Sequence, residues 1–241
     1  TKSDGSFNNV VTDNAGNVIL NESLRFDRTF DRTFFIFGAG ASYKPTKALE
    51  LYANFSQNYR PVTFNDIRIT NPSNRIDENI TDETGYTADL GIRGRVKNSL
   101  VYDVSLFSLL YDNRIGEIVD PQDGVGRFRG NIGAARIHGI ETFADLNLQS
   151  LFFAPVTQLK LNYFMNLALT TSKYTRSEQN NVVDNQVEFI PKVNVKTGFN
   201  FGLGNFLGSL QYTYIDKQFT DANNSGPLFE DARNAGIIGS I

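Results

Sequence analysis

The fold is decided by residues 159–170, LKLNYFMNLALT, in which apolar and largely polar side chains alternate one by one. Leu159 and Leu161 fall on one face of an extended chain, and Lys160 and Asn162 fall on the other, because successive side chains of a strand point to opposite faces. A helix would need a repeat of 3.6 residues, which this run does not have. The run therefore predicts a β-strand with one apolar and one largely polar face.

The same alternation recurs on both sides of this run. Beyond Phe107 the alternation blurs, so no face is assigned there, and Gly139 is expected to mark a bulge that changes the facing. The pattern predicts eight strands, at about residues 34–43, 49–56, 86–93, 102–107, 127–148, 159–170, 192–203 and 209–214.

The connections between these strands are sorted by length. Short reversals lie near 44–48, 97–99 and 204–205, with a somewhat longer one at 149–157. Long polar loops lie between them, at 59–85, 173–190 and 217–238, with an intermediate one at 119–126. Nothing in a soluble β-sandwich requires short connections at one end and long ones at the other. An outer-membrane barrel, in contrast, has short periplasmic turns at one rim and long extracellular loops at the other.

Composition excludes several other classes of protein. With 23 Lys and Arg against 26 Asp and Glu the net charge is −3, so nothing favours a nucleic-acid partner. The absence of Cys excludes a disulfide framework and a thiolate metal site. No apolar run reaches the roughly 18 residues of a membrane-spanning helix. A mean hydropathy of −0.29 is still compatible with a membrane barrel, because lipid-facing and lumen-facing residues average out along each strand.

Backbone geometry then favours a large closed barrel. In hydrocarbon every N–H and C=O must be paired within the protein, so the strands have to close into a ring. At roughly 3.3 Å per residue, the candidate at 127–148 would overshoot a bilayer even when tilted by about 45°. Several aromatic residues fall near strand ends, where an interfacial girdle would place them: Tyr43, Tyr59, Tyr86, Tyr102 and Phe206.

Four stretches carry a resemblance to a known family, the TonB-dependent outer-membrane receptors, and within it to the ferric citrate and siderophore transporters. The most specific is Arg129-Gly130-Asn131-Ile132-Gly133 followed by Arg136-Ile137-His138-Gly139-Ile140-Glu141, since an Asn-x-Gly with a Gly-x-Glu a few residues on is a habitual strand signature of these barrels. The others are Ala41–Thr46 running into Leu49–Ser56, Asn58–Pro61, and Asp82–Tyr86 running on to Leu90–Gly94.

The resemblance implies an all-β fold: an antiparallel up-and-down transmembrane β-barrel, of which this chain forms about eight strands out of a probable 22. Residues 1–241 would be a partial barrel domain, with a loop or irregular strands at 1–33, strands over 34–217, and an extracellular loop with the start of the next strand at 218–241. Neither a plug domain, nor a TonB box, nor a signal peptide is expected within the chain.

The function that the resemblance implies is energised uptake of a ferric chelate, ferric citrate or a siderophore, across the outer membrane of a Gram-negative bacterium. The expected partners are the ferric chelate or another small nutrient, the TonB–ExbB–ExbD complex acting through the missing plug, and outer-membrane lipid and lipopolysaccharide. The fragment alone should be inactive in transport. Two alternatives stay open: the same architecture importing an oligosaccharide or a cobalamin, and a small outer-membrane barrel or adhesin with a structural or binding role.

Arginines are the candidate ligand-binding residues, because guanidinium groups bind the carboxylate oxygens of an anionic chelate bidentately and stay charged. Their other possible role is to pair with acids around them, such as Asp66 and Asp77. Arg93 and Arg95 fall opposite Leu90, on the polar face. The full set of candidates is Arg60, Arg68, Arg75, Arg93, Arg95, Arg127 and Arg129.

No other group of residues points to chemistry. The single His138 is expected to be a wall residue and Glu141 a lumen-facing structural carboxylate, since neither has a second ligand or nucleophile placed near it in sequence. The acidic run Asp77, Glu78, Asp82, Glu83 lacks the spacing of a calcium loop and is expected to be solvated. We therefore expect no catalytic residues, no metal site and no cofactor, and the chain is not expected to be an enzyme.

Overall fold

The computed structural model describes residues 2–12, 18–29, 32–68, 74–122, 124, 126–152 and 158–225, with side chains from residue 32 onward. These residues form β-strands and two short helices. The elements are β1 Lys2–Thr12, β2 Val18–Thr29, β3 Gly38–Thr46, β4 Leu49–Arg60, α1 Phe64–Ile67, β5 Arg75–Ile76, β6 Glu83–Val96, β7 Leu100–Val119, β8 Arg127–Asn147, α2 Leu148–Phe152, β9 Leu159–Arg176, β10 Val193–Leu203 and β11 Phe206–Ile215.

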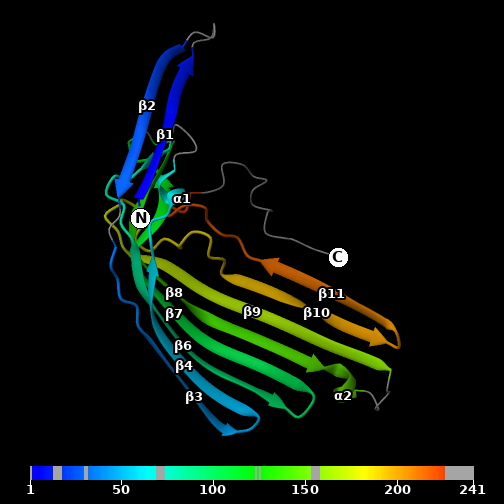
Figure 1. Cartoon of the computed structure of the whole chain (residues 1–241). Coiled ribbons are helices and arrows are strands. Elements are labelled where there is room, and N and C mark those ends of the chain that lie inside the picture. Colours follow the sequence, from blue (N-terminus) through cyan, green and yellow to red (C-terminus); the bar gives the residue numbers. More distant parts are fainter. Residues whose placement is uncertain are drawn as a thin grey trace.

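The main sheet is a curved antiparallel wall (Figure 1). Its strands follow the order β11-β10-β9-β8-β7-β6-β4-β3, so each strand pairs with the next long one along the chain. This confirms the predicted up-and-down arrangement of eight strands. The two-residue β5 joins β8 in parallel at the side and was not expected, since two residues carry no alternation. Strands β1 and β2 pair separately, with a register shift between Val11 and Thr12.

The two ends of the wall differ as the sequence predicts. At one end, here called the turn end, strands are joined by tight turns at 47–48, 97–99 and 204–205 and by α2. At the other, here called the loop end, the connections at 61–82 and 177–192 are long and the one at 120–126 is intermediate. The sheet thus has the sorted connections of an outer-membrane barrel wall.

Cross-strand register keeps the two faces of the wall distinct. One row across the sheet contains Leu51, Ile92, Val104, Thr142, Leu167, Val195 and Tyr214. The adjacent row, on the opposite face, contains Glu50, Arg93, Asp103, Phe143, Asn166, Lys196 and Thr213. On the apolar face the side chains stay open to the surroundings: Leu90 is 60% and Leu106 57% exposed.

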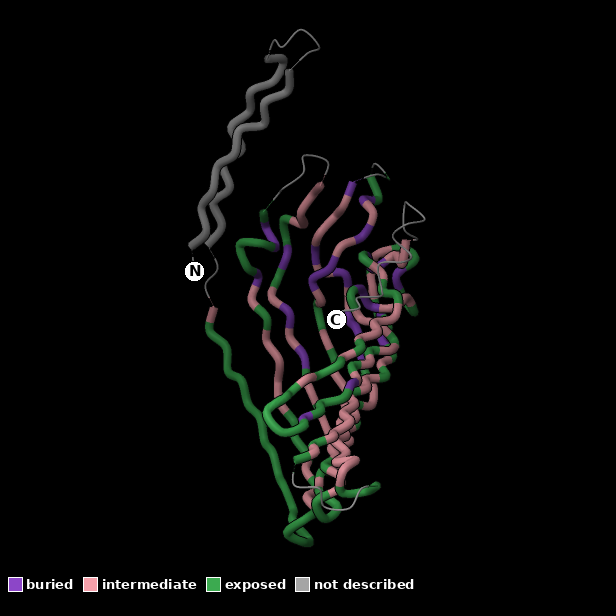
Figure 2. Tube along the Cα trace, turned by 90° about the vertical axis from the view of Figure 1, so that its right-hand side faces the viewer, coloured by how far each residue is buried: buried purple, intermediate pink, exposed green. Residues whose placement is uncertain are grey.

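Buried residues are concentrated toward the loop end (Figure 2), and the buried apolar residues form two clusters there. One cluster holds Ile118, Ile132, Ala135, Ile137, Tyr174, Val182, Val187 and Ala222, and a smaller one holds Val62, Ile67, Ile80 and Ile115. Within the described part of the chain, no second layer packs on the strands near the turn end. Their apolar face is therefore not the dry interior of a sandwich.

Three sequence expectations need correction or fall outside the description. The ladder of β3 begins at Gly38, not Phe34, although Gln57 still donates its backbone N–H to Phe37 O at 2.9 Å. Gly139 lies in regular register between Phe107 and Thr170, and the irregularity of β8 falls at residues 133–135. The expected start of a further strand lies in residues 226–241, outside the described part.

Neither of the two helices in the described ranges has the length and apolar composition needed to cross a membrane.

Candidate functional site

The loop end is organised around a ribbon made of the last residues of β7 and the first residues of β8, which extends beyond the neighbouring strands. The loop 61–82 attaches to one edge, where Asp77 N–H donates to Arg129 O at 2.8 Å. The segment after β11 attaches to the other edge, where Ala222 N–H donates to Glu117 O at 2.8 Å. We call this ribbon with the loops 61–82, 177–192 and 216–225 the cap.

Asn131, the centre of the Asn-x-Gly signature, fastens the loop 61–82 to the ribbon. Its Nδ2 donates to Thr81 O at 2.9 Å and to Asn113 O at 2.6 Å. Its Oδ1 accepts from the Thr81 N–H at 2.6 Å and from the Thr81 hydroxyl at 3.1 Å. An amide is needed here because the site requires a donor and an acceptor on one short side chain.

The glycines of the signature allow close approach of β8 to its neighbours. Gly133 has φ +155°, and a Cβ there would lie 2.0 Å from Arg176 O. A Cβ at Gly139 would lie 2.2 Å from Leu169 O. Both contacts are with backbone atoms, which cannot rotate away. The signature is thus explained by structure rather than by ligand chemistry.

The larger cavity of the cap, here the central cavity, has a volume of about 700 Å³. It lies between β4, β6, the β7–β8 ribbon and the loop 177–192. Its charged lining consists of Arg60, Arg114, Arg129, Asp66, Glu83, Glu117 and Glu188. A volume of this size is in the range of small-molecule sites.

Arg60 joins two carboxylates at the wall of the central cavity. Its Nη2 lies 2.7 Å from Asp66 Oδ1 and its Nη1 lies 3.2 Å from Glu83 Oε1. Glu83 is almost fully buried and also accepts the Ile115 backbone N–H at 2.6 Å. The pairing of Arg60 with Asp66 agrees with the alternative structural role that the sequence allowed.

Arg114, which sequence reasoning missed, lies deeper in the same cavity. Its Nη2 is 3.5 Å from Glu188 Oε1, and its guanidinium carbon is 5.4 Å from the centre of the Tyr111 ring. Tyr174 is fully buried and its hydroxyl donates to Glu188 Oε2 at 2.7 Å. Arg114 follows Asn113, whose φ is +52°, in the part of β7 where the alternation is lost. The alternation blurs beyond Phe107, so sequence alone assigned neither a face nor a site to this part of the chain.

A smaller cavity of about 210 Å³ adjoins the central one and shares Glu117 and Arg129 with it. The described residues that line it are Asn65, Arg68, Asn74, Arg75, Ile76, Glu117, Arg127 and Arg129, and four of these eight are arginines. We call it the arginine pocket. This lining favours an anionic group as its occupant.

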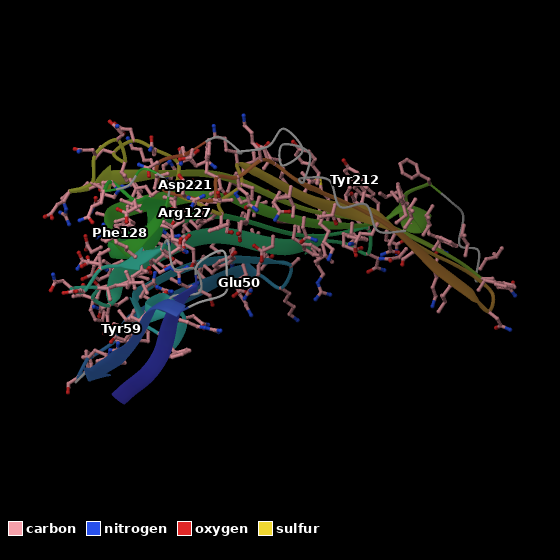
Figure 3. The ribbon with its side chains drawn as sticks, turned by 90° about the horizontal axis from the view of Figure 1, so that it is seen from above. Glu50, Tyr59, Arg127, Phe128, Tyr212 and Asp221 are labelled. Atoms are coloured by element: carbon pink, nitrogen blue, oxygen red, sulfur yellow. The ribbon has the colours of Figure 1, made fainter. Side chains whose placement is uncertain are left out.

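Three of these arginines are paired with acids, which lie 45, 94 and 12 residues away along the chain. Arg75 Nη2 donates to Asp120 Oδ1 at 2.8 Å, and Arg75 Nε donates to the other carboxylate oxygen. Arg127 Nη1 lies 2.8 Å from Asp221 Oδ2, and Figure 3 shows these two residues close together. Arg129 binds Glu117 through Nε at 2.9 Å and donates from Nη1 to Asn65 O at 2.7 Å.

Carboxylates in the loops of the cap are stabilised in their charged form. Burial alone would raise the pKa of Asp66, but hydrogen bonds from the Thr63 hydroxyl and N–H and from Arg60 hold it below its ordinary value of 3.8. The Arg75 guanidinium holds the pKa of Asp120 below 3.8 despite burial. These loops are therefore held together by ionised side chains.

The structure divides the seven predicted arginines into two groups. Arg60, Arg68, Arg75, Arg127 and Arg129 come together at the loop end around the two cavities. Arg93 and Arg95 lie at the turn end, on the polar face as predicted, in a groove of about 630 Å³. Arg93 is paired bidentately with Glu50 at 3.0 and 3.1 Å and lies over the Tyr52 ring.

Comparison with known proteins agrees with this architecture. Residues 5–236 match the family model described as TonB dependent receptor-like, beta-barrel. No curated protein sequence matches the chain.

Solved structures similar to the chain include the ferric citrate transporter FecA in its unliganded form, with a TM-score of 0.61 and 20% identity over 91% of this chain and 30% of that one. The ferric yersiniabactin uptake receptor FyuA from Yersinia pestis has a TM-score of 0.60 and 17% identity over 92% of this chain and 31% of that one. The ferric-catecholate import receptor Fiu from E. coli K12 has a TM-score of 0.63 and 13% identity over 90% and 30%. The chain therefore spans about 30% of the length of these proteins.

Proposed function

Because this chain belongs to the family of TonB-dependent receptor-like β-barrels, we propose that it forms part of the wall of an outer-membrane receptor that imports an anionic ferric chelate. The receptor would lie in the outer membrane of a Gram-negative bacterium. The 241-residue chain alone would not transport, because it spans about 30% of the length of the similar receptors.

The distribution of side chains supports a membrane orientation with the cap outside the cell. The exposed apolar row through Leu51, Ile92 and Val104 would contact acyl chains and lipopolysaccharide, and the polar row through Glu50 and Arg93 would face the lumen. An arginine on the lipid face would cost about 2–4 kcal/mol at the midplane, which gives a physical reason for its place on the polar face.

The substrate class is inferred from the arginines at the loop end. Besides Arg114, five of them, contributed by three different segments, line two adjoining cavities, and such a collection can contact several oxygens of a carboxylate-rich chelate. This convergence of guanidinium groups is the observation that carries the proposal. The central cavity of about 700 Å³ has room for a chelate, whereas the arginine pocket of about 210 Å³ has room for one arm of it.

Energy for release into the periplasm would come from the TonB–ExbB–ExbD complex, acting on a plug domain elsewhere in the receptor. Residues of this chain would supply the lumen wall against which such a plug packs. The polar face offers Tyr52, Asp103 and Glu141 around a groove of about 530 Å³ for that contact. A removable plug suits a polar, wet contact better than a dry apolar one.

Uptake of radioactive iron by cells that contain the full receptor tests this function. Under iron limitation, ferric citrate should be taken up only when both the receptor and TonB are present. Exchanging Arg129 for Gln should lower uptake at low chelate concentration, whereas the matched charge loss Lys47→Gln in the β3–β4 turn should not. Uptake of vitamin B12 or an oligosaccharide, with no iron uptake at any concentration, would replace the proposed substrate class. A receptor with no uptake of any kind would favour a structural or adhesive role.

A further inference from the structure

Arg114 is bonded differently from the other paired arginines of the cap. Arg60, Arg127 and Arg129 each have a carboxylate oxygen within 3.2 Å of a guanidinium nitrogen, and Arg75 is held just as closely. The carboxylate paired with Arg114, that of Glu188, is 3.5 Å away, and the Nε of Arg114 is buried without an acceptor among the described residues. A buried donor without a partner costs about 1–3 kcal/mol, more when it is charged. Its guanidinium therefore has unused capacity for an anionic oxygen.

We propose that Arg114 is the anchoring residue of the central cavity, binding a carboxylate group of the ligand in competition with Glu188. This proposal rests on the function proposed above and names the side chain that holds the acidic part of the chelate. The ligand group would take the place of Glu188 beside the guanidinium of Arg114, a residue that lines the cavity. Arg114 would keep its contact with the Tyr111 ring, which fixes the plane of the guanidinium.

The neighbouring acids are satisfied without Arg114, so the exchange leaves no carboxylate without a partner. Glu188 keeps the hydrogen bond from the fully buried Tyr174 hydroxyl, at 2.7 Å. Glu83 keeps the Ile115 N–H and Arg60. Each acid thus keeps a hydrogen-bond donor, while Glu188 gives up its positive neighbour to the ligand carboxylate, so the ligand contact has to exceed the cost of that loss.

Low exposure makes the contact with an incoming anion strong. The Arg114 side chain is only 17% exposed, compared with 44% for Arg60 on the rim of the same cavity. A charge shielded from water is screened less by salt and interacts more strongly with an anion than an exposed one does.

The test is calorimetric titration of iron-free citrate into the purified full receptor, in a detergent solution of fixed ionic strength. Arg114→Gln should weaken citrate binding by about 10-fold to 100-fold, since hydrogen bonds between charged groups are the strong ones. Glu188→Gln should tighten it about 3-fold or more, because the competing charge is removed while the amide still accepts from Tyr174. Arg114→Lys should be intermediate, because a lysine keeps the charge but not the bidentate geometry. Lys47→Gln serves as the control for loss of one positive charge.

The opposite signs of the two variants distinguish an anchor from a structural ion pair. If Arg114→Gln and Glu188→Gln both weaken citrate binding, or if wild-type receptor binds no citrate, the proposal is overturned. If Arg114→Gln fails to fold, judged by its mobility on gels before and after heating, Arg114→Lys and Glu188→Gln still show whether each change weakens or tightens citrate binding. Iron uptake by a receptor that does not bind citrate would refute only the Arg114 proposal. If citrate binds and the two variants change its affinity in the expected directions, but no iron is taken up, only the proposed transport function would be refuted.

Discussion

Replacing Asn131 by Ala should release the loop 61–82 from the β7–β8 ribbon while leaving the wall intact. The change removes the two hydrogen bonds that Asn131 Nδ2 donates to Thr81 O and Asn113 O, and the two that its Oδ1 accepts from Thr81. These bonds lie near solvent, so the low end of the usual range applies, about 0.5 kcal/mol each and about 2 kcal/mol together. Since a factor of ten corresponds to about 1.4 kcal/mol, local opening should become roughly 25-fold more frequent.

Hydrogen–deuterium exchange of the full receptor in detergent, read by mass spectrometry, measures this opening. Peptides covering residues 74–82 should exchange about 25-fold faster in Asn131→Ala, whereas peptides from the middle of β9 should not change. Asn131→Asp keeps the acceptor for the Thr81 N–H but loses both donors, so its effect should be smaller. Equal exchange rates in Asn131→Ala and wild type would show that the amide does not hold the loop, and acceleration throughout the wall would show a global role instead.

Three further predictions concern the wall and the cap. Gly133→Ala should lower the yield of folded, heat-modifiable receptor. A Cβ there would lie 2.0 Å from the backbone oxygen of Arg176 in the neighbouring strand, and the φ of this position is one that L residues rarely adopt. In folding titrations with lipid vesicles, Leu90→Arg should cost about 2–4 kcal/mol, and Arg93→Leu on the polar face should cost clearly less; equal costs would contradict the assignment of faces. The pKa of Asp66 lies below 3.8, so the charged Asp66 side chain stabilises the folded loop fully above that pH, and this contribution is lost as the pH falls below it. Hydrogen exchange around α1, corrected for intrinsic rates, should therefore accelerate between about pH 4 and 2 in wild type but not in Asp66→Asn.

The faces of the wall were predictable from sequence because one physical rule governs them. Wherever one side of a strand meets an apolar and the other a polar environment, the alternation has period two, and β9 shows it from Leu159 onward. The rule fails in β7 beyond Phe107. There Leu109 and Tyr111 face inward and pack against the cluster of the cap, while Leu110 faces outward and stays 40% exposed. Both faces are apolar in this part of β7, so the sequence pattern does not show which side chains face inward and which face outward.

The candidate site was predictable only in part, for a related reason. Residue type and loop position identified five arginines that the structure brings to the loop end, and Arg60 pairs with the nearby Asp66 as sequence allowed. The partners of Arg75 and Arg127, Asp120 and Asp221, are 45 and 94 residues away along the chain. Such pairs depend on how the loops cross the ribbon, which no local pattern records. Arg114 was missed because the alternation is lost beyond Phe107, and the register of β7 is irregular between Tyr111 and Ile115.

The long β8 strand passes through two environments, and its glycines and Asn131 mark the transition. From Asn147 to Gly139 it is a wall strand with an apolar outer face, and from Ala135 to Arg127 it belongs to the cap, with Ile132 among the most buried side chains. The register irregularity at residues 133–135 falls between the two parts and changes which side chains face inward. Since the wall needs strict alternation and the cap needs an apolar interior, one strand can serve both only by changing its register between them. A loop fastened at Asn131, directly beside that change, can therefore vary in sequence without altering the pairing of the strands below.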